Sequence, residues 1–336
     1  MEKINQIEIN NFKSIKHLKV DGFKKINVFI GMPNAGKSNL LEALGLFGGF
    51  NAYNRTIKDF VRFGNYNELF FEENVNDSLK IKIEKSELIF TRHKSLYNWN
   101  QNSESGLSLG NEVPFGYGFD NGNGLSESDA HNYIAKIYKY HFSNIAAKNV
   151  KSGLKTLNFP LGENLVEIIA TNPIIRKEVI RLFNLSRLKL LIDKNSNEIK
   201  LFKEYQDGTF FTLSYELIAD TLQRLIFYKV AIMSNENSVL LFEEPEAHCF
   251  EPYVQEFTNS VKYDKNDNQF FIVTHSDFII QEFLRDEESR NNTSIYLVNN
   301  IDGETKVKQL LKENNEDVYE LGMNPFFNFE SLWDAN

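Results

Sequence analysis

The chain has 336 residues, of which 42% are hydrophobic and 25% are charged, and its formal net charge is −9. This composition is typical of globular proteins that bury a core, and the acidic balance argues against a protein that coats nucleic acid through its overall charge. The sequence contains no long apolar run, and its first residues lack the apolar core of a secretory signal. Its single cysteine, Cys249, excludes an internal disulfide framework. We therefore expect a cytoplasmic protein without a membrane span.

The first hundred residues show the period-two pattern of strands. Apolar and polar residues alternate in three segments, Ile4–Asn10, Ile15–Val20 and Ile26–Ile30, which we expect to be strands. A helix is expected from Ser38 to Phe47, and residues 78–93 have the pattern of a hairpin.

The middle of the chain is less regular. Residues 97–128 are rich in Asn, Gly and Ser and have no sustained period, which predicts a loop or a mobile insertion. Residues 129–193 repeat apolar side chains every three to four positions, which predicts a helical lobe. Residues 197–216 have the pattern of a hairpin that turns at Asp207 and Gly208.

The last part of the chain alternates helical and strand patterns. The expected elements are helices over 218–233, 253–263 and 278–288 and strands over 239–242, 269–276, 294–300 and 305–311. Such alternation predicts an α/β fold. We expect three parts: an N-terminal lobe (1–95), a loop and helical insertion lobe (96–200), and a C-terminal lobe (201–336).

One short segment has the pattern of a phosphate-binding loop. Gly31, Gly36, Lys37 and Ser38 match G-x-x-x-x-G-K-[ST], with an apolar strand before the loop and a helical pattern after it. Glycines allow backbone N–H groups to surround phosphate oxygens, the lysine reaches the β- and γ-phosphates, and the Ser38 hydroxyl ligates Mg²⁺. The segment therefore predicts nucleotide binding.

Two further groups are expected beside this loop. Glu243 and Glu244 follow an apolar strand, at the end where ligands bind in a parallel sheet. Glu243 would hold Mg²⁺ with Ser38, and Glu244 would polarise the attacking water as the catalytic base. His275 ends the next apolar strand and is the candidate sensor of the γ-phosphate.

Together these segments resemble the ABC-type ATPases of the SMC, RecF and OLD group, a group that includes AAA-like ATP-binding proteins of bacterial defence and repair loci. The resemblance covers roughly residues 1–95 and 210–300. It implies a P-loop NTPase head of the ABC type, with an N-terminal antiparallel β subdomain and a helical insertion. It also implies ATP and Mg²⁺ as cofactors and ATP hydrolysis as the reaction.

The resemblance adds several candidate nucleotide contacts. The loop contacts include Asn34, Ala35 and Asn39, and the signature segment before the second motif contributes Thr221 and Gln223. In this group the signature acts across a dimer. Thr221 stands where a glycine is usual and Glu243 where an aspartate is usual, and both departures favour slow hydrolysis.

The resemblance also bears on partners. It implies a homodimer or higher homo-oligomer and suggests the ATPase half of a two-component anti-phage system whose separate effector is a Toprim-type nuclease. A RecF-like ATP-gated clamp on duplex DNA in repair is the alternative, and a transporter subunit is a remote one. The basic residues that could meet DNA or a partner are Lys13, Lys16, Lys19, Lys24, Lys25, Arg176, Lys177, Arg181, Arg187 and Lys189.

Overall fold

The protein is described by a computed structural model, which covers residues 3–49, 57–84, 86–93, 96–103, 105–109, 136–143, 150–183, 188–193 and 198–335. The chain folds into two compact units. The first unit comprises Met1–Lys139, Asn237–Glu244 and Gln269–Asn336, and the second comprises Tyr140–Glu236 and Pro245–Asn268. Each unit is therefore built from segments that are far apart in the sequence.

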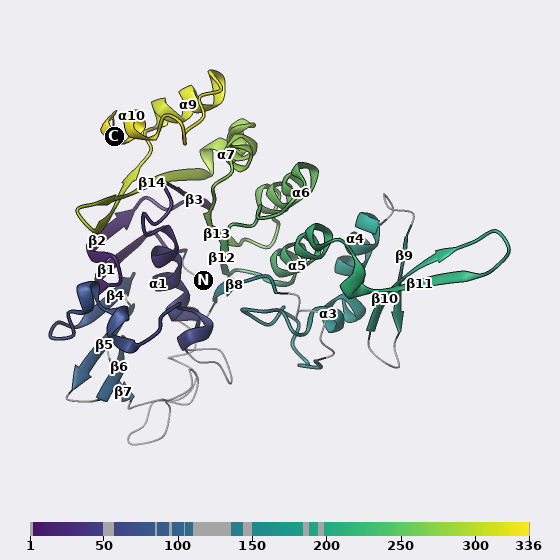
Figure 1. Cartoon of the computed structure of the whole chain (residues 1–336), viewed down its shortest axis with the longest axis horizontal. Coiled ribbons are helices and arrows are strands. Elements are labelled where there is room, and N and C mark those ends of the chain that lie inside the picture. The colour runs from purple at the N-terminus through teal and green to yellow at the C-terminus, as the bar shows by residue number, and fades with distance from the viewer. Residues whose placement is uncertain are drawn as a thin grey trace. The chain divides into compact units, whose positions relative to one another are not determined.

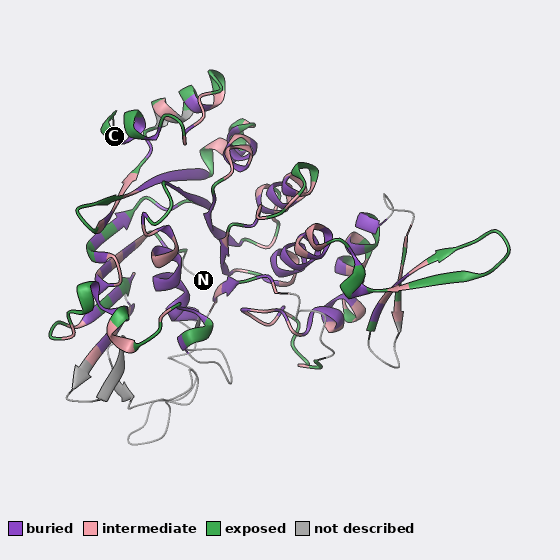
Figure 2. Ribbon diagram, in the orientation of Figure 1, coloured by how far each residue is buried: buried purple, intermediate pink, exposed green. Residues whose placement is uncertain are grey.

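The first unit contains a six-stranded sheet in the order β15-β14-β3-β13-β12-β8 (Figure 1). Its strands are β3 (Ile26–Ile30), β8 (Ile137–Tyr140), β12 (Val239–Glu243), β13 (Gln269–Val273), β14 (Thr293–Ile301) and β15 (Glu304–Gln309). Strands β14, β3, β13 and β12 run parallel, and β15 pairs antiparallel with β14. Strands β3 and β13 are buried along their whole length, as expected for the centre of a parallel sheet (Figure 2).

The register of this sheet decides where its strands end. Glu243 on β12 is paired with Val273 on β13, and Val273 is paired with Phe29 on β3. The residues that follow these strands therefore emerge at the same edge of the sheet, which is the edge where parallel sheets bind ligands.

A second, antiparallel sheet of the first unit has the order β2-β1-β4-β5-β6-β7. Its strands are β1 (Gln6–Phe12), β2 (Ile15–Asp21), β4 (Leu79–Ile83), β5 (Ser86–His93), β6 (Leu96–Ser103) and β7 (Ser105–Leu109). The expected N-terminal strands and hairpin are confirmed. The expected loop over 97–128 is wrong for β6 and β7, because these polar segments extend the hairpin by backbone pairing with β5 and with each other. The rest of that loop lies outside the described residues.

The helices of the first unit are α1 (Lys37–Gly49), α7 (Asp277–Leu284), α8 (Glu287–Asn291), α9 (Lys312–Glu320) and α10 (Phe329–Ala335). Helix α1 confirms the helix expected after the phosphate-binding loop. The expected helix over 278–288 is divided in two, because Asp286 caps α8 by accepting a hydrogen bond from Ser289 N. In α10, Phe329, Leu332 and Trp333 are buried, so this terminal turn packs on its own unit.

The second unit combines helices with a three-stranded sheet of order β11-β10-β9. Its elements are α3 (Leu165–Thr171), α4 (Pro173–Phe183), β9 (Lys189–Asp193), β10 (Glu198–Glu204), β11 (Phe210–Ser214), α5 (Asp220–Ser234) and α6 (Glu251–Lys262). The hairpin with its turn at 207–208 is confirmed, and β11 is exposed (Figure 2).

The helical expectation for 129–193 is wrong at two places. Residues Ile137–Tyr140 and Lys189–Asp193 are strands, although helices α3 and α4 do form between them. Segments of four or five residues are too short for periodicity to separate a strand from a helix, and their pairing with β12 and β10 decides the outcome. The α/β fold class is confirmed. Among the described residues, every helix is too short or too polar to form a membrane span.

We expect Gly48→Ala to destabilise the protein, because a Cβ at Gly48 would lie 1.8 Å from Ile137 O. Helix α1 would have to move away from the β8 backbone, at a cost of about 1–3 kcal/mol in the free energy of unfolding. The matched control is Gly45→Ala on the same helix, where the nearest atom would be 3.4 Å away. Urea unfolding followed by circular dichroism should give a lower midpoint for Gly48→Ala only. Equal midpoints for the two variants would contradict this packing.

Candidate functional site

The phosphate-binding loop follows β3 at the edge of the parallel sheet where β12 and β13 also end. Thr305 on β15 is hydrogen-bonded to the loop. Ala35 N donates to Met32 O (3.3 Å), and Thr305 Oγ1 donates to Ala35 O (3.0 Å). Gly36 has φ +97°, and a Cβ at this position would lie 1.9 Å from Thr305 Oγ1. Both the backbone angle and the close approach therefore require glycine here.

Lys37, at the start of α1, is buried beneath this loop. Its Nζ donates to the carbonyl oxygens of Gly31 (2.9 Å) and Met32 (2.8 Å). Burial lowers the pKa of Lys37 to about 8, although the Glu244 and Glu243 carboxylates act in the opposite direction. The ammonium therefore lies within the loop and is bonded to its backbone oxygens.

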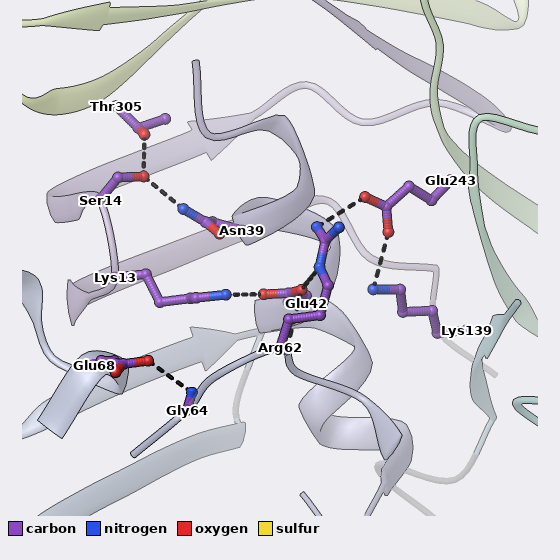
Figure 3. Close-up of polar contacts among 10 residues, drawn as sticks. All are labelled: Lys13, Ser14, Asn39, Glu42, Arg62, Gly64, Glu68, Lys139, Glu243 and Thr305. Atoms are coloured by element: carbon purple, nitrogen blue, oxygen red, sulfur yellow. Dashed lines mark hydrogen bonds and ion pairs between the residues drawn. The ribbon is translucent and has the colours of Figure 1, made fainter. Parts of the chain in front are cut away.

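The two asparagines of this region take different positions. Asn34 is exposed at the tip of the loop with φ +61°. Asn39 Nδ2 donates to Ser14 Oγ (2.6 Å), and Ser14 Oγ lies 2.6 Å from Thr305 Oγ1 (Figure 3). Asn39 thus ties α1 to the turn between β1 and β2.

The carboxylate of Glu243 is surrounded by donors (Figure 3). The Ser38 hydroxyl is hydrogen-bonded to it, Arg62 Nη2 lies 3.1 Å from its Oε1, and Lys139 Nζ lies 3.3 Å from its Oε2. Burial alone would raise the pKa of Glu243, but Lys139, Ser38 and Arg62 together hold it below its usual value. Glu243 is therefore ionised at neutral pH.

A second buried carboxylate continues this arrangement. Glu42 on α1 is fully buried, and it pairs with Arg62 Nε (2.9 Å) and with Lys13 Nζ (2.5 Å). Burial would lower the pKa of Arg62, but Glu243 and Glu42 outweigh it and raise the pKa. Five charges of alternating sign thus run from Lys13 to Lys139, and we call this series the ion-pair chain.

Glu244 and His275 lie at the same edge of the sheet. Glu244 has φ +46° and a half-exposed side chain, and its Oε1 is 3.4 Å from His275 Nε2. Burial, and then the charge of Lys37, lower the pKa of His275, while Glu244 opposes the shift. The ring of Phe326 stacks on the His275 ring, with centroids 6.4 Å apart.

The signature residues belong to the second unit. Thr221 lies in the first turn of α5 and is partly exposed. Gln223 is buried, and its Nε2 donates to the carbonyl oxygens of Ile218 (2.9 Å) and Glu216 (3.4 Å). The Gln223 amide thus fixes the segment that leads into α5.

The neighbouring oxygens of Ser38 and Glu243 fit a magnesium site. A hydroxyl and an ionised carboxylate are hard oxygen donors of the kind that Mg²⁺ prefers, and here they are already in hydrogen-bond contact. The sequence predicted this pair of residues. It gave no sign of Arg62, Lys139 or Glu42, because single charged residues carry no motif.

Comparison with protein families gives a match over most of the chain. Residues 3–223 match the AAA ATPase domain family AAA_15. Individual curated proteins match over short segments only. An ATP/GTP phosphatase of Helicobacter pylori is 58% identical over 41 residues, which is 12% of this chain and 11% of that protein. The DNA replication and repair protein RecF of Lactococcus lactis is 43% identical over 42 residues, which is 12% of each chain.

Solved structures show the fold. A crystal structure of an SmcHead bound to the C-winged helix domain of ScpA is 17% identical, with a TM-score of 0.53 over 93% of this chain and 99% of that one. A Pyrococcus furiosus Smc head domain with an extended coiled coil is 14% identical, with a TM-score of 0.55 over 96% and 99%. The chain therefore belongs to the AAA ATPase domain family, and its fold is that of SMC head domains.

Proposed function

We propose that this protein binds ATP with Mg²⁺ and hydrolyses it slowly, using the site at the edge of the parallel sheet. The observation that supports this most is the convergence of three segments: the loop over Lys37, the bonded pair Ser38 and Glu243, and the pair Glu244 and His275. The loop and Lys37 hold the phosphates, and Ser38 and Glu243 hold the metal. Bound Mg²⁺ supplies charge neutralisation on the phosphate oxygens.

Glu244 is the proposed base for the attacking water. Its side chain is half exposed and lies beside a histidine whose lowered pKa favours the neutral imidazole at neutral pH. A neutral His275 can donate a hydrogen bond to a γ-phosphate oxygen or to Glu244, and it keeps the carboxylate oriented. In this division of roles, Glu244 accepts the proton of the attacking water, and His275 holds the Glu244 carboxylate in position.

We further propose that the ATPase assembles with a second copy and controls a separate effector protein, with a Toprim-type nuclease in anti-phage defence as the expected class. The support is the family membership and the resemblance of the signature and second motif. RecF-like binding of duplex DNA is the alternative. The ion pairs of Lys13, Lys16, Arg181 and Lys189 with nearby carboxylates weaken this alternative, because paired cations leave less charge for DNA phosphates.

Glu244→Gln should lower steady-state ATP turnover by about 100-fold or more, because the amide cannot accept the proton of the attacking water. Binding of ATP should be retained, since the phosphate contacts are unchanged. The measurement is phosphate release by the pure protein together with equilibrium binding of a fluorescent ATP analogue. Glu87→Gln, on β5 of the antiparallel sheet, is the control and should turn over normally.

Unchanged turnover in Glu244→Gln would remove Glu244 from its role. Repeating the assay with linear duplex DNA separates the two partner classes. Turnover that ignores DNA supports control of a protein effector, whereas strong stimulation by DNA, lost in Glu244→Gln, would favour the RecF-like alternative.

Binding of ATP should weaken above about pH 8, because the pKa of Lys37 is about 8 in the free protein. Phosphate contact requires the protonated ammonium, so above this pH binding must take up a proton and Kd rises by up to about tenfold per pH unit. Lys37→Arg keeps its charge at every pH tested and should bind with a flatter profile. A wild-type Kd that stays constant through this pH range would contradict the buried position of Lys37.

A further inference from the structure

Lys139 is a buried cation that has no role in the proposed hydrolysis. Its side chain is 8% exposed, and its Nζ lies 3.3 Å from Glu243 Oε2. Arg62, which holds the other oxygen of Glu243, is by contrast 69% exposed at its side chain. An ammonium is costly to bury unless a charged partner stays beside it, so Lys139 depends on Glu243 in this state of the protein.

The fold provides a passage for the Lys139 side chain. Strand β8 is the edge strand next to β12, and Gly45 of α1 faces the Lys139 stem, so that a Cβ there would lie 3.4 Å from Lys139 Cδ. Gly45 has no side chain to occupy this space. The Lys139 stem therefore passes over α1 at Gly45, and its buried ammonium contacts the Glu243 carboxylate.

Lys139 and the metal would share one carboxylate. The Ser38 hydroxyl and Lys139 Nζ both contact Glu243, so the ammonium stands beside the position that the oxygens of Ser38 and Glu243 offer to a divalent cation. A divalent cation that binds Glu243 must share it with Lys139 or displace it. Without the metal, the ammonium has three N–H donors and can keep Glu243 while it also contacts a phosphate oxygen of a bound nucleotide. Where the metal displaces it from Glu243, the ammonium is still buried and the phosphates become its anionic partner.

We propose that Lys139 is a resident cation of the nucleotide site: it neutralises Glu243 in the free protein and contacts the nucleotide phosphates when nucleotide binds, so that ATP binds even without Mg²⁺. This inference rests on the proposed function. It assigns Lys139 to the phosphate contacts, in addition to Lys37, and makes Mg²⁺ and Lys139 competitors for Glu243.

The test is equilibrium binding of mant-ATP to the full chain, first in excess EDTA and then with increasing Mg²⁺. Wild type should bind in EDTA. Lys139→Gln should lose about 10- to 100-fold in affinity in EDTA, as expected for one charge-assisted hydrogen bond. In the same variant, the Mg²⁺ concentration that gives half of the Mg²⁺-dependent change in mant-ATP binding should be lower than in wild type. The reason is that a competitor for Glu243 has been removed.

Two variants separate this role from a loss of stability. Lys139→Arg keeps the charge and should retain binding in EDTA. Lys229→Gln removes an equally buried lysine, 9% exposed and 3.3 Å from Glu256 Oε2 in the second unit, and should change neither titration. A variant that merely folds poorly would bind mant-ATP less tightly both in EDTA and in Mg²⁺. For Lys139→Gln we instead expect a lower affinity in EDTA and a lower Mg²⁺ concentration for half-maximal binding.

The outcomes distinguish this inference from the proposed function. Wild type that binds in Mg²⁺ but not in EDTA would overturn the role of Lys139 and leave ATP binding intact. Equal EDTA affinities of wild type and Lys139→Gln would overturn it as well. Wild type that binds in neither buffer would overturn the proposed function itself.

Discussion

The parallel register of β3, β13 and β12 is the constraint on which the site depends. It places Phe29, Val273 and Glu243 at one level, so that the residues after each strand emerge together. Backbone hydrogen bonds extend this alignment beyond the strands, from Thr274 N to Phe29 O and from Glu244 N to Val273 O. This backbone alignment brings the phosphate-binding loop, the two carboxylates and His275 to one edge, and side-chain contacts such as that of Thr305 with Ala35 O then hold the loop in place.

The charges at this edge are organised around two buried carboxylates. Exposed ion pairs contribute little to stability, and buried ones often fail to repay the loss of hydration. Glu42 is fully buried, and Glu243 is mostly buried, yet each has two cationic partners. Such an arrangement is weak evidence for stability. It fits the proposed function, in which this site would receive the charge of a triphosphate and a metal.

Much of this site could be predicted from the sequence because its motifs are local. Gly31, Gly36, Lys37 and Ser38 lie close together in the chain, and the strand before each motif is mostly apolar. The ion-pair chain could not be predicted. Arg62 is 181 residues from Glu243 in sequence, and an isolated arginine in an unpatterned segment is usually solvated.

Much of the fold could also be predicted from the sequence, because the patterns that indicate strands and helices are local. Strands with clear alternation or continuous burial, such as β1 and β13, were identified correctly. Strand β6 was missed because its sequence, LYNWNQNS, is mostly polar, and its pairing with β5 cannot be derived from that composition. Strand β8 has only four residues, and its position next to β12 cannot be derived from its own composition.

An experimental structure of the Glu244→Gln variant with ATP and Mg²⁺ would test the proposed nucleotide site directly. We expect the triphosphate in the loop over Lys37, with Mg²⁺ at the Ser38 and Glu243 oxygens. We also expect Lys139 Nζ to contact a phosphate oxygen. A triphosphate bound elsewhere would contradict this nucleotide site. So would a metal that contacts neither Ser38 nor Glu243, directly or through water.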